Sequence, residues 1–181
     1  PAPTKPDDML GNIALRTRSV VAELRMVPNQ PLVFPDDPGN QRYEDEIIAY
    51  TFDKYLRTED PTWPLLLPMV KSAVRAMDTV QDHLAKTTDG KLAIQSFVVS
   101  GGSKRGWTTW LTAAVDKRVR AIAPVVIDVL NMDEQMRHHF AAYGFYSQAI
   151  GDYEQMKVLD RLGSQDGAAI QNFVDPYSYR D

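Results

Sequence analysis

The sequence predicts an α/β fold with a mostly parallel sheet and flanking helices. Two short apolar runs, residues 97–101 and 121–127, predict buried strands, and the amphipathic segment 104–115 between them predicts a helix. A strand, a helix and a second strand in this order indicate a right-handed parallel crossover. The repeated alternation of strands and helices along the chain favours the α/β class.

The chain begins with weakly patterned segments. Residues 1–8 are rich in Pro and Asp, and we expect little order there. Residues 19–26 are apolar and β-branched at their start, which predicts a strand that ends before Pro28 and Pro31. Residues 34–42 contain two prolines, two aspartates and a glycine, and they predict a loop.

Two helices are predicted next. Residues 43–56 carry an apolar side that includes Ile47 and Ile48. A longer helix follows the break at residues 61–64 and ends near Lys86. Its apolar residues recur at alternating steps of three and four, which indicates one buried stripe: Leu66, Val70, Ala73, Met77, Val80 and Leu84.

The predicted strands and the segments that follow them complete the fold. Continuous apolar strands are typical of a sheet covered on both faces. We interpret Trp107 and Trp110, on the helix between the strands, as core residues rather than as a cofactor site. Beyond Leu130 the chain predicts amphipathic helices, with residues 130–170 as a helical lid or insert, and then a non-helical tail over 173–181.

The turn before the helix 104–115 carries the motif most informative about function. Ser103 stands between Gly101 and Arg105, and Gly106 follows. A nucleophile elbow usually reads G-x-S-x-G, because its sharp strand-to-helix turn leaves no room for side chains two positions from the serine. Here the second glycine comes one place late. The motif still predicts an elbow of the α/β-hydrolase type if Arg105 turns outward and Gly106 packs against the strand.

Such a turn assigns catalytic roles to Ser103 and Lys104. It lifts the Ser103 hydroxyl above the carboxyl ends of the strands, where open α/β sheets bind ligands. The Lys104 N–H, at the helix N-terminus, would face a developing oxyanion, and one such donor contributes about 3–4 kcal/mol. The Lys104 and Arg105 side chains would add positive charge if they pointed inward. Alternatively, Ser103 is a helix N-cap, or the turn binds phosphate, although the full P-loop spacing is absent.

A serine nucleophile also needs a base and an acid, which follow it in chain order in this fold. Asp128, at the end of the second strand, is a candidate acid, and its alternative role is an N-cap. His83 precedes the elbow, and His138 and His139 come soon after the second strand, so we expect surface roles for them. No further apolar strand follows. We therefore expect the acid, the base and at least two strands to lie outside these 181 residues, which form the central part of one incomplete domain.

Composition excludes several classes of protein. The net charge of -4 argues against a nucleic-acid binder, and the absence of Cys excludes thiolate catalysis. No stretch approaches the roughly 20 apolar residues that span a bilayer. No metal-ligand spacing appears, since His138 and His139 are adjacent, so we expect no metal and no cofactor. Residues 36–60 hold eight acidic and three basic side chains, which predicts a solvated face.

Three segments carry a resemblance to a known family. Residues 27–32, 100–110 and 123–132 resemble the PhoPQ-activated pathogenicity-related (autocrine proliferation repressor-like) proteins, and the resemblance extends from about Ile13 to Tyr179. It implies an α/β-hydrolase-like fold and a secreted or periplasmic location. Ser103 matches the family's presumed nucleophile, and Lys104 matches the neighbour whose N–H would serve the oxyanion. The family's presumed acid and histidine lie beyond the matching segment.

We therefore expect a serine hydrolase of esterase or peptidase type that acts through an acyl-enzyme on Ser103. Its partner would be a small-molecule or peptide substrate, and the sequence sets no oligomeric state. The alternative is a non-catalytic secreted binding or signalling protein that keeps the hydrolase fold. A third hypothesis is a phosphate or nucleotide binder that uses the Gly-Gly-Ser-Lys turn.

Overall fold

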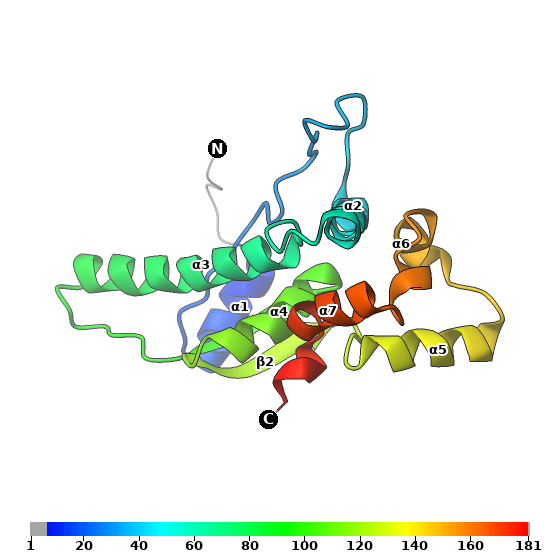
Figure 1. The fold of residues 1–181 in the computed structure, drawn as a ribbon. Helices are drawn as coiled ribbons and strands as arrows, with labels where there is room; N and C mark the ends of the chain where they lie inside the picture. The colour runs from blue at the N-terminus through cyan, green and yellow to red at the C-terminus, as the bar shows by residue number, and fades with distance from the viewer. Residues whose placement is uncertain (1–6, 181) are drawn as a thin grey trace.

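The computed structural model describes residues 7–180, and it shows several helices and one two-stranded parallel sheet (Figure 1). The mixed helix-and-strand class predicted from the sequence is confirmed. The predicted lack of order at residues 1–6 lies outside the described residues. The main elements are α1 (Asp8–Thr17), α2 (Glu44–Thr58), α3 (Leu66–Thr87), β1 (Phe97–Gly102), α4 (Lys104–Val115), β2 (Val119–Val125), α5 (Met132–Tyr143), α6 (Gly151–Gln155) and α7 (Gln165–Val174).

The sheet has the predicted strand–helix–strand crossover. Strands β1 and β2 pair in parallel, with Val98 opposite Ala121 and Gly102 opposite Val125. Helix α4 packs on both strands and covers one face. Val98 and Val125, on the other face, are 71% and 50% exposed. The expectation of two covered faces is therefore wrong for residues 7–180, because α4 supplies a covering layer on one side only.

The hydrophobic core lies between α2, α3, α4 and the C-terminal helices. Ile48 and Phe52 of α2 are fully or almost fully buried, and Phe52 packs edge-on against Trp107 of α4 at 5.9 Å between ring centroids. The Trp107 indole Nε1 donates to the Val174 carbonyl at 2.6 Å, which ties α4 to the end of α7. The core interpretation of Trp107 is confirmed, and Trp110 packs against the same cluster.

Helix α3 buries the predicted stripe mainly at its N-terminal half. Leu66, Val70 and Met77 are buried, and the later members of the stripe, Val80 and Leu84, are half-buried. The C-terminal half of α3 extends beyond the packed body in Figure 1. Its stripe therefore has fewer neighbours to bury it.

The C-terminal third of the described chain is helical, and one buried carboxylate organises it. Asp175, 4% exposed, accepts the Asn131 and Met132 N–H groups at 3.1 and 2.7 Å, and so caps the start of α5 from a distant part of the chain. It also accepts the Tyr177 N–H at 2.9 Å. That bond opens a 3₁₀ helix at Pro176–Tyr179, so the prediction of a wholly non-helical tail is wrong.

Near the N-terminus one prediction is also wrong, and one helix was not predicted. Residues 20–25 form no strand, because a strand needs a pairing partner and these residues pair with none within 7–180. Helix α1 was missed, although Asp7 marks its start by accepting the Met9 and Leu10 N–H groups. No helix within residues 7–180 is long and apolar enough to cross a membrane.

Candidate functional site

Ser103 sits at the junction between the last residue of β1 and the first residue of α4, and its backbone is strained. Its φ of 52° and ψ of −126° lie outside the regions that ordinary residues populate. Such a conformation costs about 1–3 kcal/mol and persists only where the surroundings hold it. The Ser103 N–H donates to the Val125 carbonyl at 2.9 Å, which anchors the turn to the end of β2.

Two glycines permit this turn. A Cβ on Gly101 would lie 2.6 Å from the Arg105 carbonyl oxygen, and a Cβ on Gly106 would lie 2.9 Å from the Gly101 carbonyl oxygen. Both distances are far shorter than any real Cβ contact, so only glycine fits at either position. The Arg105 side chain is 41% exposed and reaches Glu44 at the start of α2. The late glycine of the motif therefore provides the close helix–strand approach.

The Ser103 side chain does not cap α4. Ser103 occupies the N-cap position of this helix, as the alternative interpretation expected, but within residues 7–180 its side chain makes no capping hydrogen bond. Ser103 itself is half-buried. Its hydroxyl accepts no hydrogen bond from the first N–H groups of α4.

The cationic side chains after Ser103 turn toward the start of α2. Lys104 Nζ lies 2.5 Å from a Glu44 carboxylate oxygen and 3.0 Å from Asp45 Oδ2, and its side chain is only 5% exposed. Arg105 donates to both Glu44 oxygens at 3.1 Å. Both cations are thus paired within the protein, and the structure does not direct them at a ligand beside Ser103.

Glu44 is the centre of this network. Hydrogen bonds from Arg105, with further contributions from Lys104 and Gln30, lower the pKa of Glu44 to about 2 against the opposing effect of partial burial. Gln30 Nε2 donates to Glu44 Oε1 at 2.5 Å, and the Glu44 N–H donates back to Gln30 Oε1 at 3.0 Å. The sequence missed the role of Glu44, because the acidic run 36–60 predicted only a solvated face, and it gave no signal for Gln30.

Asp128 lies in the loop after β2 and is exposed. The N-cap position of α5 is Asn131, so the alternative role of Asp128 as that cap is wrong, and Asp175 supplies the carboxylate instead. No hydrogen bond or ion pair of Asp128 occurs within residues 7–180. Its role as the catalytic acid stays a prediction.

The three histidines occupy helices outside the elbow. His83 on α3 and His138 on α5 are exposed, as predicted. His139 Nε2 accepts the Ser147 N–H at 3.1 Å, and its ring stacks on Tyr146. Within the described part of the chain no hydrogen bond joins a histidine to Ser103, and no group of three or more His, Asp or Glu side chains could hold a metal ion.

Comparisons with known proteins identify the family. The sequence model of the PhoPQ-activated pathogenicity-related proteins matches residues 1–181. The chain belongs to this family. It is also similar to autocrine proliferation repressor protein A of Dictyostelium discoideum, with 43% identity over 180 residues. That match covers 99% of this chain but 36% of the relative, so the chain spans about a third of the relative's length. No solved structure matches.

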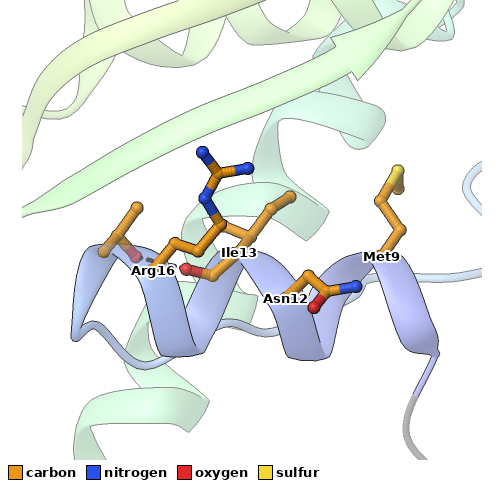
Figure 2. A pocket seen from close by; sticks show the side chains of 5 residues that line it. Met9, Asn12, Ile13 and Arg16 are labelled. Carbon is orange, nitrogen blue, oxygen red and sulfur yellow. Dashed lines mark hydrogen bonds between the residues drawn. The ribbon is translucent and has the colours of Figure 1, made fainter.

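A hollow on the surface of this PhoPQ-related chain lies outside the elbow. It measures about 540 Å³, and Figure 2 shows Met9, Asn12, Ile13 and Arg16 of α1 lining it. Only α1 residues line the hollow, no α1 side chain is buried, and Met9 is 66% exposed. The hollow is therefore the open surface of a loosely packed helix, and it contains none of the predicted site residues.

Proposed function

We propose that this chain carries the nucleophile elbow of a serine hydrolase with an α/β-hydrolase-like fold. The observation that carries the proposal is the strained backbone of Ser103, at φ 52° and ψ −126°, between a parallel strand and a helix. In that fold the nucleophilic serine sits on a sharp, strained strand-to-helix turn. The close approach at Gly101 and Gly106 supports the same geometry.

In the proposed reaction, Ser103 Oγ attacks the carbonyl carbon of an ester or peptide while a base takes the hydroxyl proton. The Lys104 N–H at the start of α4 stabilises the oxyanion. The base returns its proton to the leaving group, and water then hydrolyses the acyl-enzyme. We propose that the histidine and an acid come from segments outside these 181 residues, with Asp128 as an alternative acid.

A fluorophosphonate probe tests this proposal directly, because it bonds to a serine made nucleophilic by its site and releases fluoride. The longest natural form of the protein should be labelled on Ser103, as located by mass spectrometry. Ser103→Ala should lose the label. Ser100→Ala is the matched control: it removes a serine of β1 three positions earlier, whose hydroxyl donates to the Ala123 carbonyl at 2.7 Å. A folded wild-type protein without label on Ser103 would refute the proposal.

A second candidate function is an exported binding or signalling protein that keeps the fold without catalysis. Two observations favour it: the departure from G-x-S-x-G at Arg105 and the name of the relative, which describes an autocrine repressor of proliferation. That name also supports a secreted or periplasmic location for this chain. Under this alternative, Ser103→Ala keeps the full biological effect of the protein on cells, whereas the hydrolase proposal requires that the effect be lost.

A further inference from the structure

We propose that Glu44 is a positioning residue for Ser103: the first turn of α2 holds the two residues after the nucleophile and thereby fixes the elbow. This inference rests on the proposed function. It concerns a residue that lies about 60 positions earlier in the chain than the elbow and does not touch the reacting atoms.

The strain at Ser103 requires restraint on both sides of the residue. On the N-terminal side, the ladder between β1 and β2 and the bond from the Ser103 N–H to the Val125 carbonyl fix the backbone. On the C-terminal side, the first two residues of α4 both bind one carboxylate, that of Glu44. A side chain off its productive position by about 1 Å can lower a rate 100-fold.

Because the Lys104 side chain is buried, its ammonium group must stay paired with the carboxylates of α2. An ammonium group that is 5% exposed needs anionic partners, because an unpaired buried charge is strongly destabilising. Glu44 and Asp45 supply them, and the Tyr153 hydroxyl fixes Asp45 by donating to its Oδ1 at 3.1 Å. Lys104 therefore cannot rotate away from α2 without leaving its charge unpaired.

The Glu44 carboxylate is itself held independently of α4. Gln30 binds both its carboxylate and its backbone N–H, and Glu44 has a left-handed φ of 49° that the surroundings must maintain. Gln30, Glu44, Arg105 and Ser103 thus form one chain of restraints. Since the pKa of Glu44 is about 2, its carboxylate is ionised at every pH at which a hydrolase is usually assayed.

The test compares labelling rates in the longest natural form of the protein. Glu44→Gln keeps the shape of the side chain and removes its charge. Glu46→Gln is the matched control, since Glu46 lies in the same helical turn, is 36% exposed against 40% for Glu44, and pairs with Arg42 instead. Each second-order rate with the fluorophosphonate probe is measured from pH 5 to 9 at a temperature at which all variants are folded.

We expect Glu44→Gln to lower the rate about 10-fold to 100-fold by the same factor at every pH, and Glu46→Gln to stay within about twofold of wild type. Equal rates for Glu44→Gln and wild type, with Ser103 still labelled, would overturn the positioning role alone. No label on folded wild-type protein would overturn the proposed function and this inference with it.

Arg105→Met gives the same test should Glu44→Gln fail to fold. It removes the two bonds to Glu44 from a side chain that is already 41% exposed and leaves Lys104 paired. We expect a slower labelling rate for this variant as well. A wild-type rate in folded Arg105→Met protein would contradict the inference.

Discussion

Substitution of Gly106 by alanine tests whether the elbow is as tightly packed as the structure shows. The added Cβ would lie 2.6 Å from Ile127 Cγ2 and 2.9 Å from the Gly101 carbonyl oxygen. These distances are about 0.8 and 0.5 Å inside the 3.4 Å at which ordinary contact begins. The Ile127 side chain can turn aside, but the carbonyl belongs to β1 and moves only if the strand moves.

Overpacking of this kind costs about 2–3 kcal/mol. The higher helix propensity of alanine offsets up to about 1 kcal/mol of this cost. We therefore expect the free energy of unfolding of Gly106→Ala to fall by about 1–2 kcal/mol. With a urea dependence of about 2 kcal/mol per molar, the unfolding midpoint should drop by about 0.5–1 M.

Gly102→Ala is the control for this experiment. Gly102 lies in the same turn, but no heavy atom lies within 4 Å of its added Cβ, and we expect a change within about 0.5 kcal/mol. Urea unfolding followed by circular dichroism measures both variants. Equal midpoints for Gly106→Ala and Gly102→Ala would show that α4 does not approach β1 as closely as the structure has it.

Two further predictions concern carboxylates. Asp175→Ala leaves the N–H groups at the start of α5 without an acceptor, so we expect the free energy of unfolding to fall by about 2–4 kcal/mol. The control is Asp160→Ala, at an exposed position, for which we expect a fall of no more than about 0.5 kcal/mol; urea unfolding measures both. The Glu44 pKa of about 2 lies below the roughly 4.3 of an unfolded glutamate, so its contribution to stability is present above about pH 5 and is lost as the pH falls toward 2. The difference in unfolding free energy between wild type and Glu44→Gln should therefore shrink over that range and stay constant from pH 6 to 8; a constant difference down to pH 2 would contradict the lowered pKa.

The elements that the sequence predicted correctly are those with strong local signals. Helix α3 has a regular stripe, β1 and β2 are short apolar runs, and the predicted range 104–115 of α4 agrees with the structure at both ends. Each signal lies within the element itself, since helix and strand periodicities depend on neighbours a few positions away.

The wrong predictions depended on contacts with distant residues. Residues 19–26 have a composition suited to a strand, but a strand forms only where a second strand lies beside it. The cap of α5 shows the same limit. Asp128 is the nearer carboxylate in the sequence, yet Asp175, more than 40 residues further along, reaches the N–H groups. The sequence predicts where a helix begins and needs a cap, but it does not predict which distant residue supplies that cap.

In the candidate site, too, the sequence predicted the local feature and missed the contacts with distant residues. The sequence predicted the turn at Ser103, because this turn depends on residues close to it in the chain. Gly101 and Gly106 leave room for backbone atoms that a Cβ would contact. The directions of Lys104 and Arg105 are set by Glu44, about 60 positions away, and charge alone suggested a role toward substrate. In the structure these cations instead join the elbow to α2. Under the proposed positioning role, a mutation of Glu44 in the first turn of α2 should therefore affect Ser103 from a distance, whereas a mutation of Glu46, which pairs with Arg42, should not.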